Sequence, residues 1–222
     1  MNSNERRFSV IMTIYEQAHE LEEHLPAFLT QHYEPEYDVV VVDESSTDES
    51  PDVLKLLKNE YNNLYTTFLP KPDRHVVRKK QAYNIGIRAA KGDWLILTSI
   101  DKYPVSDDDL QSISDTMDDS ADLTLGYFTK KGIKLQAFAE YAEAEDHIIR
   151  MERRQKKQRN RKKCNYRWGR YDFIIVRRDV VVDVLKFYEL QPSFMERQAM
   201  RWRIFWKNLT SKNECIAYLP KE

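Results

Sequence analysis

Acidic side chains follow two stretches of the sequence that otherwise have the character of buried strands. The run VVVV leads directly into Asp43 and Glu44, and the run WLILTSI leads into Asp101. Carboxylates hold divalent cations and accept hydrogen bonds from the hydroxyl or imide groups of a ligand. The alternative is structural: Asp43 and Asp48 cap the turn into the next helix. The residues alone leave both interpretations open.

Strand and helix patterns alternate along the part of the chain that carries these acids. Short apolar runs rich in β-branched residues predict strands at 8–14, 37–43, 65–70, 93–101 and 121–129. Helical spacing and capping residues predict helices at 19–31, 50–61, 79–92 and 106–117, with a kink or a split at Pro26 and an end at Gly92. The alternation predicts an α/β fold with a mostly parallel central sheet and helices on both faces. Ligands of such sheets bind beyond the carboxyl ends of the strands, where the acids fall.

The overall composition narrows the class of protein. The 222 residues carry a formal net charge of −1, which gives no general attraction to nucleic acid or to a membrane surface. No stretch approaches the roughly 18 apolar residues of a membrane-spanning helix, and the start MNSNERRFSV has no apolar signal core. Cys164 and Cys215 fit neither a disulfide framework nor a zinc site, so we expect ordinary thiols in a reducing cytosol.

Glycine is scarce, and this limits the kinds of phosphate site that the chain can build. The five glycines form neither GxGxxG nor GxxxxGK[ST], which argues against a Rossmann dinucleotide site and a P-loop. A GxSxG nucleophile elbow is also absent, which disfavours an α/β-hydrolase. Acids at strand ends without a glycine cradle suggest that a metal ion carries the phosphate binding.

Four blocks between residue 8 and about residue 104 resemble family 2 of the glycosyltransferases, which have the GT-A fold. The blocks are the turn TIYE at 13–16, the helix end QHY at 31–33, the acidic run DESSTD at 43–48 and the A-x-N-x-G-I segment at 82–92. The sugar nucleotidyltransferases, which share a similar fold, begin with a glycine-rich loop that this chain lacks. The resemblance therefore implies a GT-A domain that binds a nucleotide-sugar, with a UDP-sugar favoured.

The resemblance also implies roles for residues near the nucleotide. Thr13, Tyr15, Asp43 and Glu44 are expected to contact the base and ribose, since a carboxylate accepts hydrogen bonds from an imide or from ribose hydroxyls. Lys79 falls where many members carry a basic residue near the nucleotide; the alternative is a solvated lysine on a helix. Asn84 in the fourth block is expected to fix the local turn rather than to touch the ligand.

The metal motif departs from the family pattern of Asp-x-Asp. The corresponding triplet is Ser99-Ile100-Asp101, and Lys102 follows it. The resemblance implies that Asp101 binds Mg²⁺ or Mn²⁺ bridging the diphosphate. One carboxylate is enough if the diphosphate and water complete the shell, but metal affinity without nucleotide is then poor. The alternative is that Lys102 itself neutralises part of the phosphate charge.

The catalytic base is the second departure. Inverting members of the family take the acceptor proton with the acid of a Glu-Asp motif, and the corresponding pair here is Glu196-Arg197. Glu196 is the candidate base, and a surface helix glutamate is the alternative. Asp146 is a second candidate that comes earlier in the chain than expected. Because both motifs are altered, a GT-A-like binding protein without activity is the main alternative function.

A basic segment at 150–170 follows an amphipathic helical pattern. Eleven of its residues are Lys or Arg, and only Glu152 is acidic. It is interpreted as a solvated helix and loop, as a surface for an anionic acceptor or membrane leaflet, or as a nucleic-acid site with interleaved aromatics. The last interpretation gives the third candidate function, a nucleic-acid-binding protein, although no RNA-binding module pattern accompanies it.

The sequence thus predicts one GT-A-like domain over 1–222, with a nucleotide-binding half at 8–104 and an acceptor-side half at 105–222. The expected activity is transfer of a sugar from a nucleotide-sugar to an acceptor hydroxyl with inversion, in bacterial surface polysaccharide synthesis. The expected acceptor is a glycan or a lipid-linked molecule. We expect a cytoplasmic protein, with peripheral contact at the inner membrane face through 150–170.

Overall fold

The computed structural model describes residues 6–70, 78–129, 132–139 and 171–179, together with the single residues 143, 147 and 150. Within these ranges the elements are β1 (Phe8–Ile14), α1 (Ala18–Leu29), β2 (Asp38–Asp43), α2 (Ser50–Glu60), β3 (Leu64–Phe68), α3 (Arg78–Ala89), β4 (Trp94–Leu97), α4 (Asp109–Thr116), β5 (Leu123–Thr129), β6 (Gly132–Phe138) and β7 (Phe173–Arg177). None of the described helices is long and apolar enough to cross a membrane.

The described strands form one sheet in the order β3-β2-β1-β4-β7-β5-β6. Strands β1 to β4 pair in parallel, whereas β7 is antiparallel to β4 and β5, and β6 is antiparallel to β5. The predicted α/β fold with a mostly parallel sheet is confirmed, because five of these seven strands share one direction. The antiparallel hairpin partner β6 was not predicted from the sequence.

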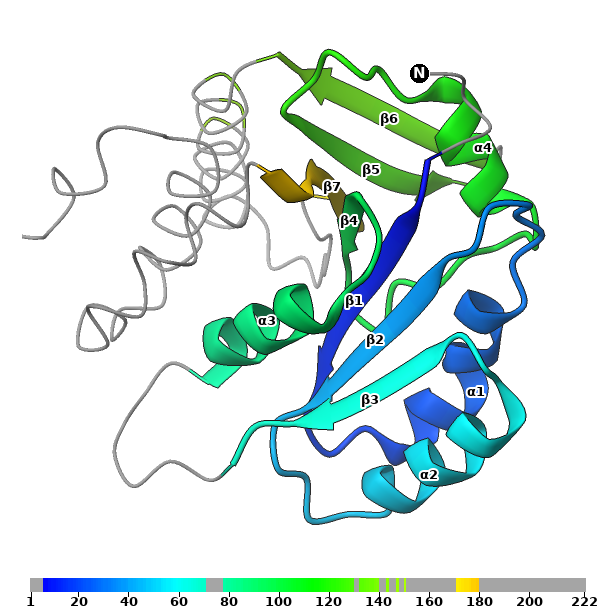
Figure 1. The fold of residues 1–222 in the computed structure, drawn as a ribbon, viewed down its shortest axis with the longest axis vertical. Helices are drawn as coiled ribbons and strands as arrows, with labels where there is room; N and C mark the ends of the chain where they lie inside the picture. Colours follow the sequence, from blue (N-terminus) through cyan, green and yellow to red (C-terminus); the bar gives the residue numbers. More distant parts are fainter. Residues whose placement is uncertain are drawn as a thin grey trace, which may run out of the picture.

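Helices cover both faces of the sheet, as the sequence predicts (Figure 1). Helix α3 packs on one face, where Val40 and Val42 point, and α1, α2 and α4 pack on the other face, where Val39 and Val41 point. All four valines are fully buried. This explains the uninterrupted valine run, because a central strand covered on both sides has no polar face.

One alternative of the prediction at Pro26 and the predicted end of the third helix are wrong. Helix α1 runs through Pro26 without the split that was predicted as an alternative to a kink, and the backbone N–H and hydroxyl of Thr30 both donate to the Pro26 carbonyl at 3.0 Å. Helix α3 ends at Ala89 rather than at Gly92. A Cβ at Gly92 would lie 2.5 Å from the backbone carbon of Phe8, so this glycine allows the turn before β4 to pass close to β1.

Candidate functional site

The order of the strands identifies one edge of the sheet as the place for a ligand. From β1 the chain steps outward through β2 to β3 and then crosses to β4 on the other side of β1. In sheets of this kind, ligands bind beyond the carboxyl ends of the two strands beside such a reversal, here β1 and β4. In Figure 1 the carboxyl ends of β1, β2 and β3 converge at the lower left. The predicted acids lie at this edge, because Asp43 ends β2 and Asp101 follows β4.

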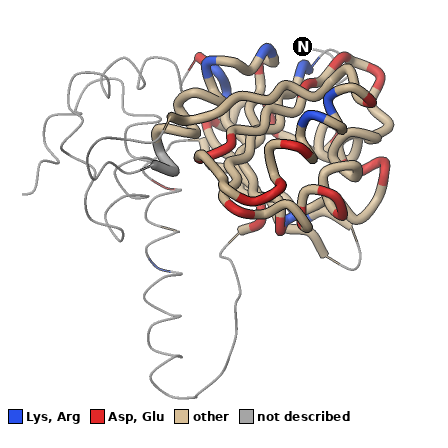
Figure 2. Tube along the Cα trace, turned by 90° about the horizontal axis from the view of Figure 1, so that it is seen from below, with Lys and Arg blue, Asp and Glu red and all other residues tan. Residues whose placement is uncertain are grey.

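The loops at this edge are strongly acidic. The segments 15–17, 44–49 and 98–103 contain five acids and one basic residue, Lys102. Figure 2, which views the molecule from below, shows more Asp and Glu than Lys and Arg positions on that side. An anionic ligand therefore needs additional positive charge to bind at this edge.

The loop after β2 is held by the carboxylate of Asp43. Its Oδ1 accepts hydrogen bonds from the backbone N–H of Ser46 at 2.9 Å and from the Ser46 hydroxyl at 2.6 Å. Ser45 has a φ of 61°, and its hydroxyl donates to the carbonyl of Leu69. The structural interpretation of Asp43 as a turn cap is therefore correct for one of its two oxygens. Asp43 is only 7% exposed, so the cap holds it in a fixed position.

The same loop also holds the segment that follows β1. Glu16 has a φ of 52°, and its backbone N–H donates to the Ser46 hydroxyl at 2.9 Å. Asp48 accepts from the backbone N–H of Ala18 at 3.1 Å. Burial alone would raise the pKa of Asp48, but hydrogen bonds from Ser50 and Ala18 hold that pKa below its ordinary value. Left-handed backbone at a non-glycine residue costs energy and persists where its surroundings fix it.

Besides Asp43, three of the predicted nucleotide contacts lie at the ends of β1 and β2. Tyr15 is 48% exposed just beyond β1, and the backbone N–H of Glu44 donates to the carbonyl of Ile14 at 2.9 Å. Thr13 is only 5% exposed, and its Oγ1 is a buried atom that makes no hydrogen bond of normal geometry. A buried hydroxyl without a good hydrogen bond costs free energy, which makes Thr13 a notable position in β1, whose other hydroxyl, on Ser9, donates to Asp38.

The turn after β4 carries the predicted metal ligand. Asp101 is exposed, and the backbone N–H of Lys102 closes the turn on the Ser99 carbonyl at 2.9 Å. The Lys102 ammonium pairs with Asp172 at 2.9 Å, and Asp172 also accepts from the backbone N–H of Phe128 at 2.9 Å. The basic side chain next to Asp101 is therefore already committed to a carboxylate on the segment before β7.

The donor atoms near Asp101 fit one kind of metal site only. Among the described residues, no group of three or more His, Cys, Asp or Glu side chains could hold a metal ion. A single exposed carboxylate does not retain Mg²⁺ or Mn²⁺ alone, but it suits a cation whose other ligands are diphosphate oxygens and water. The residues thus fit a metal that arrives with a nucleotide, and not a metal held by protein ligands alone.

The remaining predicted site residues are less fully described. Lys79 lies in the first turn of α3, which begins after the chain has left β3 at the carboxyl edge. Glu196, Asp146 and all of the basic segment except residue 150 lie outside the described residues. The Asn84 Oδ1 is buried without a hydrogen-bond partner, so this oxygen does not fix a turn as predicted.

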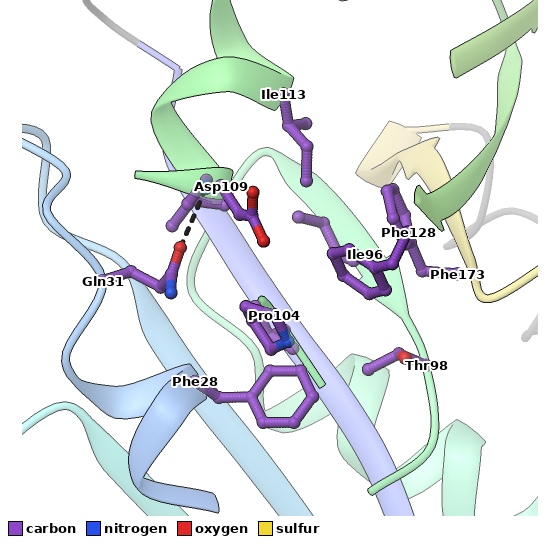
Figure 3. Close-up of a pocket in the computed structure, with 11 residues that line it drawn as sticks. Phe28, Gln31, Ile96, Thr98, Pro104, Asp109, Ile113, Phe128 and Phe173 are labelled. Atoms are coloured by element: carbon purple, nitrogen blue, oxygen red, sulfur yellow. Dashed lines mark hydrogen bonds between the residues drawn. The ribbon is translucent and has the colours of Figure 1, made fainter. Parts of the chain in front are cut away.

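Gln31, which belongs to the second family block, has a structural role. Its amide nitrogen donates to the carbonyls of Ala27 and Ser106 at 2.9 and 3.0 Å, and its Oε1 accepts from the N–H of Leu110 at 2.9 Å. Gln31 thereby joins the end of α1 to the start of α4. It borders an apolar cavity of about 30 Å³ (Figure 3), which has room for about one water molecule and is too small for a nucleotide.

A larger pocket lies at the opposite edge of the sheet. It has a volume of about 520 Å³ and is lined by Arg7 and by residues 33–38, 62–65 and 91–92. These segments precede β1, β2, β3 and β4, at their amino ends. Because ligands of open α/β sheets bind at the carboxyl ends, this pocket is not the candidate site.

Sequence reasoning missed two residues that organise the carboxyl edge. Tyr83 has a fully buried ring on α3, and its hydroxyl donates to the Thr98 carbonyl at 2.6 Å. Asp172 anchors Lys102 from 70 residues further along the chain. The one available signal for Asp172 was an acid immediately before the apolar run FIIVR, whereas Tyr83 has the helical spacing of an ordinary core residue.

Comparisons with known proteins agree with this geometry. The model of the family described as Glycosyl transferase family 2 matches residues 9–185. No curated protein matches the chain.

Residues 1–349 of TarS from S. aureus, solved alone and in complex with UDP, have a TM-score of 0.54 and 17% identity over 91% of this chain and 55% of that chain. The mannosyltransferase PcManGT from Pyrobaculum calidifontis, in complex with GDP-Man and Mn²⁺, has a TM-score of 0.46 and 27% identity over 54% of this chain and 34% of that chain. The chain thus spans about a third to about half of the length of these structures, and at this identity the likeness to TarS shows the fold alone.

Proposed function

The chain belongs to glycosyl transferase family 2, and on that premise we propose that it transfers a sugar from a nucleotide-sugar donor to an acceptor hydroxyl. The observation that carries the proposal is the convergence of Thr13, Asp43, Glu44 and Asp101 at the β1/β4 edge. A strand-order reversal with carboxylates and a buried threonine hydroxyl that makes no hydrogen bond of normal geometry suits a nucleoside diphosphate held together with a cation.

The donor site divides into a nucleoside part and a diphosphate part. Thr13, Tyr15, Asp43 and Glu44 contact the base and ribose, with Thr13 offering a buried hydroxyl that makes no hydrogen bond of normal geometry within the protein. Lys79 belongs to the first turn of α3, and we propose that it supplies positive charge to an anion at this helix start, where free N–H groups also favour one. UDP is the nucleotide to test first, because the TarS structure of similar fold contains it.

The diphosphate part depends on Mg²⁺ or Mn²⁺, which Asp101 would hold. When bound, the cation offsets the negative charge of the departing nucleoside diphosphate. The positive charge of a cation is needed because the loops at the carboxyl edge are acidic and the Lys102 ammonium is paired with Asp172. Backbone hydrogen bonds at Thr98 and Lys102 hold the turn on both sides of Asp101.

The acceptor half completes the proposal. We place the donor half at 8–104 and the acceptor half at 105–222 of one GT-A domain, with Glu196 taking the acceptor proton in an inverting, single displacement. The basic segment 150–170 suits an anionic acceptor, such as a lipid-linked or surface glycan at the cytoplasmic side of a membrane. This assigns the chain to polysaccharide synthesis.

A second candidate is a GT-A-like binding protein without transferase activity. The observations that favour it are Ser99 in place of the first metal acid and the pairing of Lys102 with Asp172. Both candidates use the same edge of the sheet. They differ in whether the protein cleaves the bond between the sugar and the nucleoside diphosphate of a bound nucleotide-sugar.

Release of nucleoside diphosphate from a panel of UDP- and GDP-sugars tests the proposal. The protein is incubated with each donor and Mn²⁺, with and without mixed glycan acceptors, beside the Asp101→Asn and Glu196→Gln variants. We expect release from one donor, loss of release in Asp101→Asn, and in Glu196→Gln loss of release with retained nucleotide binding. Nucleotide binding without release from any donor would instead support the second candidate.

A further inference from the structure

Tyr83 sits beneath the candidate donor site although it belongs to the middle of a helix. Its hydroxyl reaches the end of β4 and donates to the Thr98 carbonyl at 2.6 Å. The reach is made possible by Gly86, one turn further along α3. A Cβ there would lie 2.6 Å from Ile11 Cγ2, so only glycine lets the helix approach the sheet this closely.

Two residues proposed to bind the nucleoside, Thr13 and Glu44, are neighbours of the Tyr83 hydroxyl. Burial raises its pKa, nearby Tyr171 and Glu44 raise that pKa further, and the neighbouring Thr13 side chain acts in the opposite direction. The hydroxyl therefore keeps its proton and remains a hydrogen-bond donor at neutral pH. Tyr83 and Tyr171 also belong to the same packed cluster on the α3 face of the sheet.

The Thr98 peptide, which receives this hydrogen bond, begins the turn that carries Asp101. The Thr98 N–H donates to the Ile11 carbonyl at 3.1 Å, and its Oγ1 lies 3.2 Å from the Asp172 carbonyl and 3.3 Å from the Lys102 carbonyl. Hydrogen bonds thus hold the backbone on both sides of Asp101, at Thr98 and at Lys102. The hydrogen bond from Tyr83 is the one that comes from α3, and it fixes where the turn leaves the strand.

We propose that Tyr83 is a positioning residue of the donor site, which through its hydroxyl fixes the turn 98–102, and with it Asp101, relative to the nucleoside contacts at Thr13 and Glu44. This inference rests on the proposed function. Tyr83 itself touches neither nucleotide nor metal in this arrangement. Its effect passes through the Thr98 carbonyl to the carboxylate that meets the cation.

The test is a Mn²⁺ titration at fixed UDP with wild-type protein and Tyr83→Phe, a change that removes one oxygen atom. Loss of one hydrogen bond corresponds to about a fivefold change in an equilibrium constant. We expect the Mn²⁺ concentration for half-maximal UDP binding to rise by about that fivefold factor, with UDP affinity at saturating Mn²⁺ changed by less than about twofold. Thr98→Val, which loosens the same turn from the side of Asp172, is expected to raise the Mn²⁺ midpoint as well.

Tyr37→Phe is the matched control for a purely structural effect. The Tyr37 hydroxyl donates to the Leu29 carbonyl at 2.8 Å and accepts from the Gln31 N–H at 3.0 Å, remote from the carboxyl edge. Its loss lowers stability and leaves the Mn²⁺ midpoint unchanged. An unchanged midpoint in Tyr83→Phe, or equal weakening at low and saturating Mn²⁺, would overturn the inference while leaving the proposed function standing. Failure of the wild-type protein to bind UDP or GDP would overturn the proposed function and this inference with it.

Discussion

Thr13→Val should change stability and ligand affinity in opposite directions. Thr13 is 5% exposed near the carboxyl end of β1, and its hydroxyl has no hydrogen bond of normal geometry. A hydroxyl that loses water on folding without gaining a partner costs about 1–3 kcal/mol. Valine has nearly the same shape and suits a strand, so the substitution removes this cost without leaving a cavity.

The expected gain is about 1 kcal/mol in the free energy of unfolding, at the low end of the cost above, because the Thr13 hydroxyl lies near the Tyr83 hydroxyl, where a poorly aligned hydrogen bond offsets part of the cost. For a chain of this size that gain corresponds to a rise in Tm of roughly 2–4 °C. The same substitution removes a ligand contact, so the Kd for UDP with Mn²⁺ should rise by about fivefold. A residue that costs stability and contributes to binding is typical of a functional site.

Thermal unfolding and UDP titration of the same preparations provide the assay, with Ser9→Ala as control. Ser9 lies on the same strand and is fully buried, but its hydroxyl donates to Asp38 at 2.6 Å and accepts from the Gly92 N–H at 2.7 Å. Removal of this satisfied hydroxyl should lower Tm and leave UDP affinity unchanged. A lower Tm in Thr13→Val would refute the reasoning, because it would mean that the hydroxyl is already paired within the protein.

Three further predictions concern other parts of the chain. The hydrogen bond from Arg6 lowers the pKa of Asp119 in the folded protein. The pair therefore contributes stability above the unfolded pKa of 3.8, and this stability is lost as the pH falls through the lower folded value. The Tm difference between wild type and Asp119→Asn should accordingly shrink from about pH 6 to about pH 3. Gly126→Ala should destabilise by about 1–3 kcal/mol in denaturant unfolding, because its Cβ would lie 2.0 Å from the buried Phe173 ring, and trimming that ring to leucine should recover part of the loss. Ser99→Asp supplies a second carboxylate, so calorimetry should detect tighter Mn²⁺ binding without nucleotide; unchanged binding would show that residue 99 does not face the metal.

The parallel half of the sheet was predictable because its signals are local. The valine run needs only its own composition to indicate a strand buried on both faces, and β-branched runs separated by amphipathic helices indicate the crossovers. The antiparallel half was less predictable. The run FIIVR reads as a strand, but its insertion between β4 and β5 depends on pairings with residues far away in the sequence.

Some residues of the candidate site were likewise predictable from the sequence, and others were not. Acids at strand ends are visible in the sequence, and the cap formed by Asp43 on Ser46 was one of the two interpretations that the spacing allows. The roles of Tyr83 and Asp172 were not visible, because one partner is a backbone carbonyl and the other a lysine 70 residues away. Contacts of this kind exist only once α3 and β7 have packed against the parallel strands.

The measurement that tests the central claim most directly is calorimetric titration of UDP into the protein, with and without Mn²⁺, beside the Asp101→Ala variant. A nucleotide site whose cation is held by a single carboxylate predicts that UDP binds only when both Mn²⁺ and Asp101 are present. Equal binding by wild type and Asp101→Ala in Mn²⁺ would contradict the assignment of the metal to Asp101. The absence of any heat of binding with either UDP or GDP would contradict a nucleotide site at the β1/β4 edge.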